Sequence, residues 1–161
     1  MRSRLLLLAL PLFLLAGCGD DPVRVGSKNF TENRVLAELI TQVLEAEGIP
    51  AEPHIGIGDT RAVFEALRTG EIDIYPEYSG TALALLGMPV TADPAESRER
   101  ASAEFAHLGI ETGQPFGFDS RFAIVMLADL AERDGIARIS DLEATAGGLV
   151  LAVTDEFARR P

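Results

Sequence analysis

The sequence has a single cysteine and only two histidines. One cysteine cannot form an internal disulfide, and no Cys/His spacing in the chain is typical of a zinc site. His54 and His107 stand apart from each other, so we expect both to be surface or packing residues and expect no metal site. No nucleophile and base occur together in a recognisable motif, which argues against an enzyme and gives no reason to expect a cofactor.

Basic residues are also scarce, with 14 Lys and Arg against 25 Asp and Glu, and the formal net charge is -11 at pH 7. Nucleic acid is therefore excluded as a partner, because phosphate binding needs a positive surface. The chain contains no internal repeat. Its 161 residues are enough for one domain, or for one domain and part of another.

Residues 1–17 have the pattern of an export signal. Two arginines precede an apolar run from Leu5 to Leu15, and this run is too short for a membrane span. The small residues before Cys18 resemble the lipobox of bacterial lipoproteins. That resemblance implies cleavage before Cys18, a lipid on its thiol, and a periplasmic or extracytoplasmic location at the face of the cell membrane. An ordinary secretory signal with an incidental cysteine is the alternative.

Strand and helix patterns then alternate along the chain. Val23–Val25 is a predicted strand, and Asn29 with Glu32 forms a capping-box pattern at the start of a helix that ends before Gly48. The apolar residues of this helix recur at helical spacing and predict its inner face: Val35, Leu36, Leu39, Ile40, Val43 and Leu44. Ala51–Ile57 predicts a second strand.

A second helix is predicted to follow a cap at Asp59 and Thr60, with Val63, Phe64 and Leu67 on one face. Glu71–Ile74 alternates polar and apolar residues, which predicts a third strand that must stop at Pro76 because proline has no N–H to donate. This alternation of strands and helices indicates an α/β fold with a parallel sheet.

Ligands of open parallel sheets bind beyond the carboxyl ends of the strands. Lys28 follows the first predicted strand, Asp59 and Thr60 follow the second, and Tyr78–Thr81 follows the third. These loops are therefore expected to open on one rim. The Tyr78 ring can face a cation, and the Ser79–Thr81 turn offers N–H groups to an anion. Together they suit a zwitterion.

The second half predicts a capped helix from Asp93-Pro94 and a strongly apolar strand at Arg121–Leu127. Further on, a Ser140-to-Glu143 capping box predicts a short helix, Leu149–Val153 predicts a buried strand, and Thr154 begins one more helix. We interpret residues 18–128 as a first α/β lobe and residues 129–161 as the incomplete beginning of a second, because so short a segment cannot bury a core.

Two long motifs, GSKNFTE at residues 26–32 and GEIDIYPEYSGT at residues 70–81, resemble the glycine betaine/choline/carnitine substrate-binding proteins of osmoprotective ABC transporters. The likeness continues at residues 139–142 and 156–160. The resemblance implies a type II periplasmic-binding-protein fold that closes on a quaternary ammonium ligand between two lobes. It also implies ABC permease and ATPase subunits as partners, and membrane attachment through the lipid.

The resemblance implies a role for each of five residues. Tyr78 corresponds to one wall of the family's aromatic cage, and Lys28 and Thr81 correspond to donors to the ligand carboxylate. Arg160 corresponds to the donor from the second lobe. Phe122 falls where many members carry another cage tyrosine, so it keeps a ring face but lacks the hydroxyl. The remaining cage aromatics would lie beyond the last residue, so we expect the sequence to be truncated relative to the family.

Other readings of the same residues stay open. Tyr75 and Pro76 are interpreted as structural, and Asp73 and Glu77 are expected to face solvent or a neighbouring loop rather than to act as an acid/base pair. A lipid-anchored sensor, or a non-binding relic of the same fold, is the alternative to a transport function. The sequence does not distinguish glycine betaine, choline and carnitine as ligands.

Overall fold

The structure is a computed structural model that describes residues 21–159. The predicted export signal and the lipidation site at Cys18 lie outside the described residues. The elements follow in the order β1 (Val23–Lys28), α1 (Thr31–Ala46), β2 (Ala51–Gly58), α2 (Thr60–Arg68), α3 (Ser79–Leu85), α4 (Pro94–His107), α5 (Ala128–Asp134), the 3-10 helices η1 (Ile139–Ala144) and η2 (Ala146–Gly148), and α6 (Asp155–Ala158). None of the described helices has the length and apolar character needed to cross a membrane.

The sheet consists of β1 and β2, which are parallel and joined by α1, with Val23 opposite Ala51. The predicted third strand is reduced to a single parallel bridge between Val25 and Ile74. The Gly26 N–H donates to the Ile74 carbonyl over 2.8 Å, so this segment does lie beside β1 on the side away from β2. Pro76 follows two residues later, and its missing N–H prevents the ladder from continuing.

The start of this third segment is fixed by Arg24 and Asp73. The guanidinium donates to both carboxylate oxygens, over 2.9 and 2.7 Å, and the backbone N–H of Arg24 also donates to Asp73 over 2.8 Å. These hydrogen bonds lower the pKa of the Asp73 carboxyl. Asp73 is part-exposed, as expected, but its main partner is β1 rather than a neighbouring loop.

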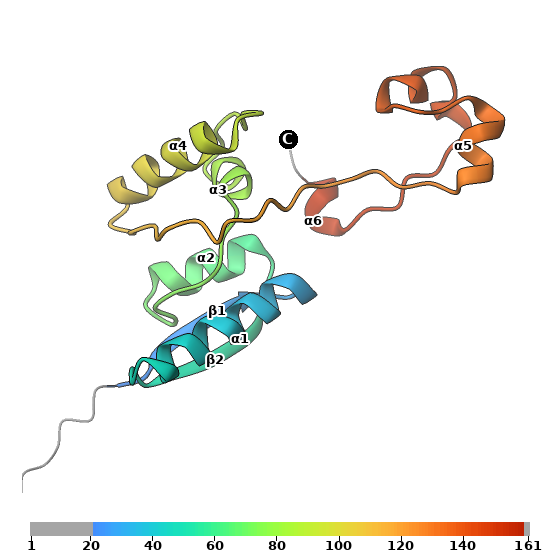
Figure 1. Ribbon diagram of the computed structural model, residues 1–161. Helices are drawn as coiled ribbons and strands as arrows, with labels where there is room; N and C mark the ends of the chain where they lie inside the picture. Colours follow the sequence, from blue (N-terminus) through green and yellow to red (C-terminus); the bar gives the residue numbers. More distant parts are fainter. Residues whose placement is uncertain (1–20, 160–161) are drawn as a thin grey trace, which may run out of the picture.

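The core lies on both sides of α2. Toward the sheet, Val63 and Ala66 pack with Ile72, and toward α3 and α4, Phe64 packs with Leu83 and other buried residues. The rings of Phe64 and Phe105 stack with their centroids 5.8 Å apart. In Figure 1, α2 accordingly lies between the β1–β2 layer and the α3–α4 pair. This packing holds the start of α3 near the end of β1.

The buried face of helix α1 coincides with the predicted one only in part, because Leu36, Ile40 and Leu44 are half-buried beside it. Asn33, Ala37 and Thr41 are buried against the sheet. Three of the predicted inner residues are instead more than half exposed: Val35, Leu39 and Val43. Small side chains at four-residue spacing let the helix approach the strands closely. The predicted capping box is also wrong, because Phe30 occupies the N-cap position and no side chain caps the helix.

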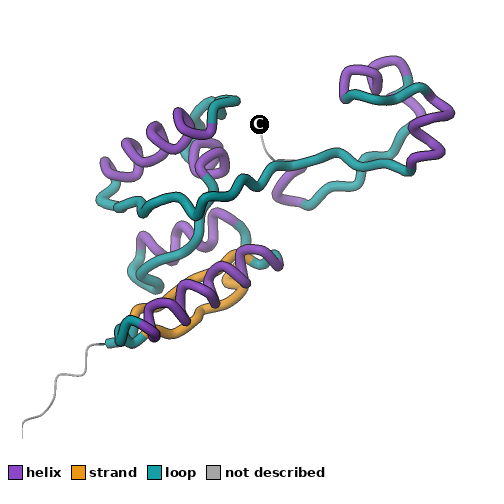
Figure 2. The backbone as a smooth tube through the Cα atoms, viewed as in Figure 1, coloured by secondary structure: helices purple, strands orange, loops and turns teal. Residues whose placement is uncertain are grey.

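The chain beyond α4 is an extended arm that runs out to α5 and returns to α6 (Figures 1 and 2). The strands predicted at Arg121–Leu127 and Leu149–Val153 are wrong, since both segments are without strand pairing in the structure. Val125 and Val150 are 87% and 98% exposed. A strand needs both a hydrogen-bonded neighbour and a face to bury, and the described residues supply neither here.

The short helix predicted near Ser140 is present as η1, but its capping box differs from the prediction. Asp141, not Glu143, accepts hydrogen bonds from the backbone N–H groups of Ala137 and Arg138, over 2.9 and 2.8 Å. The elements α5, η1 and α6 contain no buried residue. These helices are therefore not held by a buried core.

Candidate functional site

A buried ion pair lies at the carboxyl end of β1. The Lys28 ammonium contacts Oε1 of Glu77, and the two side chains are only 1% and 12% exposed. A buried charge needs a partner of opposite sign because it has lost its hydration. Glu77 was expected to face solvent or a neighbouring loop, but its carboxylate is largely buried and is the counter-ion of Lys28 in β1.

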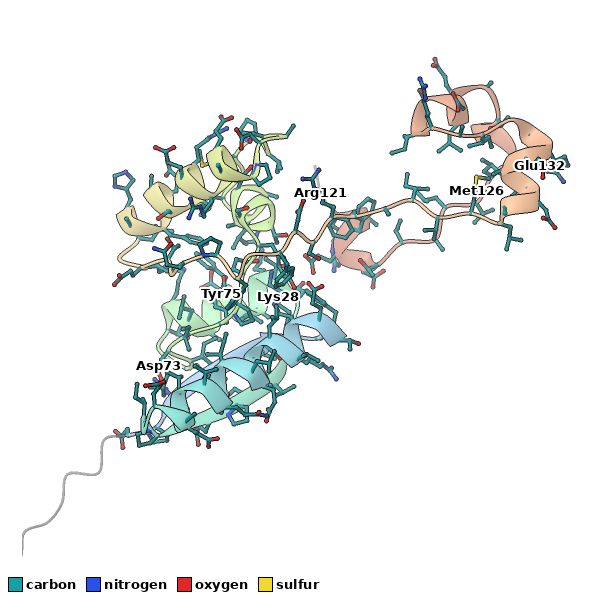
Figure 3. The ribbon with its side chains drawn as sticks, viewed as in Figure 1. Lys28, Asp73, Tyr75, Arg121, Met126 and Glu132 are labelled. Atoms are coloured by element: carbon teal, nitrogen blue, oxygen red, sulfur yellow. The ribbon has the colours of Figure 1, made fainter. Side chains whose placement is uncertain are left out.

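Two further donors hold the Glu77 carboxylate. The Tyr75 hydroxyl donates to Oε2 over 3.0 Å, and the Tyr78 backbone N–H donates to Oε1 over 2.7 Å. Figure 3 shows Lys28 and Tyr75 close together, whereas Asp73 lies apart from them, where it pairs with Arg24 near the start of β1. Tyr75 is structural, as predicted, and its contact to Glu77 fixes the loop that leads to α3.

The ring of Tyr78 has polar groups around it. The Lys28 ammonium lies 5.3 Å from the ring centroid, within the range of a cation–π contact. The Tyr78 hydroxyl donates to Glu32 over 2.5 Å, and Ser120 of the extended arm contacts the other oxygen of Glu32 over 3.5 Å. The Phe30 ring lies 5.9 Å from the Tyr78 ring. An aromatic face, a cation and two carboxylates thus meet at one place.

Asn33 ties three segments of the site together. Its side-chain oxygen accepts the Lys28 backbone N–H over 2.6 Å, and its side-chain N–H₂ donates to the Pro76 carbonyl over 2.8 Å. The sequence did not predict a role for Asn33, because the buried face of the helix was assigned from its apolar residues alone. The spacing of Asn33 with Ala37 and Thr41 is the signal that could have identified it.

The loop that follows β2 is fixed by the helix cap at its end. Asp59 caps α2 as predicted, accepting the Ala62 N–H over 3.0 Å. The neighbouring Thr60 hydroxyl donates to Glu156 of α6 over 2.8 Å. The arm therefore returns to the same edge of the sheet on which Asp59 lies.

The other predicted site residues are distributed over α3 and the arm. Thr81 is half-buried in the first turn of α3, three residues after Tyr78, which occupies the N-cap position. Phe122 is 69% exposed, and its ring centroid lies 5.2 Å from that of Phe157 in α6. Arg160 lies outside the described residues. Of the predicted set, the structure thus brings Lys28 into contact with Tyr78.

The chain's two tyrosines are both in this site, and both are expected to resist ionisation. Burial and the charge of Glu77 raise the pKa of Tyr75. Burial and the hydrogen bond to Glu32 raise the pKa of Tyr78. Tyrosine in an unfolded chain ionises near about pH 10. Because the folded-state pKa values are the higher ones, this contribution to stability is complete below about pH 10 and is lost as the pH rises further.

A spectrophotometric titration tests this prediction. We expect little tyrosinate absorbance near pH 10 in the folded chain, followed by a joint rise of both tyrosines as alkali unfolds it. Circular dichroism on the same samples reports the fold. A reversible tyrosinate signal near pH 10 in a chain that is still folded would contradict the buried, hydrogen-bonded placement of these two side chains.

Among the described residues, no group of His, Cys, Asp and Glu side chains is arranged to hold a metal ion. The site places the aromatic face of Tyr78 beside the Lys28–Glu77 ion pair and the Glu32 carboxylate. An aromatic face near carboxylates can attract a cation.

Comparison with known proteins agrees with this chemistry. Residues 21–161 match the family model of the substrate binding domain of ABC-type glycine betaine transport system. The chain is 31% identical over 148 residues to the glycine betaine-binding protein YehZ of Escherichia coli, covering 87% of this chain and 48% of YehZ. It is 32% identical over 160 residues to a glycine-betaine-binding protein of Pseudomonas aeruginosa, covering 93% of this chain and 51% of that protein.

A third relative is the ergothioneine transport permease/ergothioneine binding protein EgtU of Helicobacter pylori, 32% identical over 143 residues and covering 85% of this chain and 25% of EgtU. The solved structure of apo YehZ from Escherichia coli superimposes with a TM-score of 0.59 at 32% identity, covering 86% of this chain and 52% of that chain.

The likeness to YehZ shows that the predicted fold class is right: the described residues have the α/β arrangement of a periplasmic binding protein. The chain spans about half the length of the first two relatives that it matches. The family consists of solute-binding proteins rather than enzymes. The chain belongs to the family of substrate-binding domains of ABC-type glycine betaine transport systems.

Proposed function

We propose that this chain acts in the solute-binding component of an ABC transporter for quaternary ammonium osmoprotectants such as glycine betaine, choline or carnitine. The observation that carries the proposal is the Tyr78 ring, which lies between the Lys28 ammonium and the Glu32 carboxylate. An aromatic face near carboxylates attracts a trimethylammonium group. The family match supports the same class of ligand.

The proposed roles follow the chemistry of each side chain. Tyr78 is one wall of the cage for the ligand's ammonium, and Phe122 is a second wall brought by the arm. Lys28 and Thr81 donate to the ligand carboxylate, and Arg160 adds a donor from the second lobe. We assign residues 18–128 to the first lobe and residues 129–161 to the second, so that the ligand binds between them.

The cellular setting belongs to the same proposal. The partners are ABC permease and ATPase subunits, and the protein is held at the extracytoplasmic face of the cell membrane by a lipid on Cys18. The name of EgtU extends the candidates to ergothioneine, which is also a trimethylammonium carboxylate. Trimethylammonium compounds, with or without a carboxylate, are therefore the ligand class that we favour.

An NMR titration tests the proposed ligand class. Choline and its uncharged isostere 3,3-dimethyl-1-butanol have the same shape, so a difference between them measures the contribution of the positive charge. A desolvated cation–π contact of about 2 kcal/mol predicts about 30-fold tighter binding of choline. The resonances of Tyr78 are expected to shift with choline and glycine betaine at millimolar concentration. Equal binding of the isostere, or no shift with any of the three, would favour the sensor or relic alternative.

A further inference from the structure

The positive charge of Lys28 creates a problem for cation binding at Tyr78. Its ammonium already lies 5.3 Å from the Tyr78 ring centroid. A ligand ammonium that binds to the same ring lies within about 6 Å of its centroid and so comes within roughly 10 Å of a second positive charge. The Lys28 side chain is 1% exposed, so water screens the repulsion only weakly. Left unpaired, Lys28 would oppose the ligand that Tyr78 is proposed to hold.

Glu77 removes this problem. Its carboxylate contacts the ammonium, and within residues 21–159 this is the only ion pair that Lys28 makes. The pair as a whole is neutral. Among residues 21–159, the Tyr78 side chain has one more charged partner, the Glu32 carboxylate, which accepts its hydroxyl. Lys28, Glu77 and Glu32 together therefore place a net negative charge beside the ring, which favours a cation.

The position of the Glu77 carboxylate is fixed from two sides. The Tyr75 hydroxyl holds Oε2 over 3.0 Å, and the Tyr78 N–H holds Oε1 over 2.7 Å. The second of these bonds comes from the residue that carries the cage ring. Glu77 and the Tyr78 ring are therefore set in one rigid turn, and Lys28 is held against both.

We infer that Glu77 is a specificity-determining residue: by neutralising Lys28 beside the Tyr78 ring, it sets the preference of the site for the ligand's cation relative to the ligand's carboxylate. The inference rests on the proposed function. Without Glu77, a purely cationic ligand meets an unpaired ammonium and loses affinity. A ligand that also carries a carboxylate gains attraction to that ammonium, which offsets part of the loss.

The test compares choline with glycine betaine on the Glu77→Gln variant, which keeps the size and hydrogen-bonding oxygen of the side chain but removes its charge. We expect choline affinity to fall about tenfold or more, and glycine betaine affinity to fall clearly less. The matched control is Glu71→Gln, which removes one negative charge from an exposed position at the opposite end of the same segment. It is expected to leave both affinities unchanged.

A second variant keeps the test decisive if Glu77→Gln folds poorly with its buried, unpaired lysine. The double variant Lys28→Met/Glu77→Gln removes both charges. We expect its ratio of choline affinity to glycine betaine affinity to rise above that of the parent chain, because the carboxylate donor is gone and no unpaired cation faces the ligand ammonium.

The outcomes separate this inference from the proposed function. If the parent chain binds both ligands and Glu77→Gln weakens both by the same factor, Glu77 is only structural and the inference is overturned, while the proposed function stands. An unchanged or lower ratio of choline affinity to glycine betaine affinity in the double variant overturns it as well. If the parent chain binds neither ligand, the proposed function fails and the inference falls with it.

Discussion

Replacing Tyr78 by alanine is expected to weaken choline and glycine betaine binding by about 30-fold, the equivalent of a desolvated cation–π contact of about 2 kcal/mol. The ring is held in place by its hydroxyl bond to Glu32 and by the Tyr78 N–H bond to Glu77. It therefore contributes a rigid aromatic face rather than a mobile one. NMR or calorimetric titration of the variant against the parent chain measures the loss.

The Tyr78→Phe variant is the matched control, because it keeps the ring face and removes only the hydroxyl that donates to Glu32. We expect it to retain most of the affinity. The isostere 3,3-dimethyl-1-butanol supplies a second control, since its binding should change much less with Tyr78→Ala. Equal losses in the Ala and Phe variants would show that the hydroxyl, and not the aromatic face, is what matters.

Local signals in the sequence predicted the starts of α2 and α4 correctly, although the capping boxes predicted for α1 and η1 differ from the structure. Asp59 and Asp93 were identified as caps from their own spacing, and each accepts backbone N–H groups at the start of its helix. A cap depends on a side chain and the N–H two or three residues later, so neighbouring residues contain the necessary information. Pro94 is a further local signal for the start of α4, because an N–H in the first turn of a helix has no partner within the helix and its absence costs nothing.

The buried face of α1 depends on tertiary packing and could not be predicted from the local sequence pattern. The helix α1 has apolar residues around more than one face, and periodicity alone favoured the larger ones. The structure instead buries Asn33, Ala37 and Thr41, which fit a close approach to the sheet, and Asn33 also satisfies the Lys28 N–H and the Pro76 carbonyl. A hydrogen bond across 43 residues of sequence leaves no trace in the local pattern.

Strand prediction failed where pairing partners were missing. Ile72–Ile74 and Arg121–Leu127 have similarly strand-like sequences, yet only the first lies beside another strand, through the Val25–Ile74 bridge. An apolar run indicates what a segment can form, whereas pairing requires a neighbour. The site shows the same limit. Lys28 and Tyr78 were proposed from their positions after strands, but the pairing of Lys28 with Glu77 spans 49 residues and was not foreseen.

The packing that holds α3 in place leads to the second large prediction, that Leu83→Ala lowers the free energy of unfolding by roughly 2–5 kcal/mol. Leu83 is fully buried in the cluster that includes Phe64 and Phe105. Truncating it removes apolar contacts and leaves a cavity between α3 and α4. Leu39→Ala is the matched control: the same change at a 51% exposed position is expected to cost about 0.5 kcal/mol or less.

Urea denaturation can follow this effect with two independent probes. The chain has no tryptophan and both of its tyrosines are in the candidate site, so tyrosine fluorescence reports on the site while far-UV circular dichroism reports on the helices. Because α3 begins next to Tyr78, loss of the Leu83 anchor should move both transitions to lower urea together. If Leu83→Ala shifts the dichroism transition and leaves the fluorescence transition unchanged, the site does not depend on α3 packing, and Lys28, Glu77 and Asn33 alone maintain it.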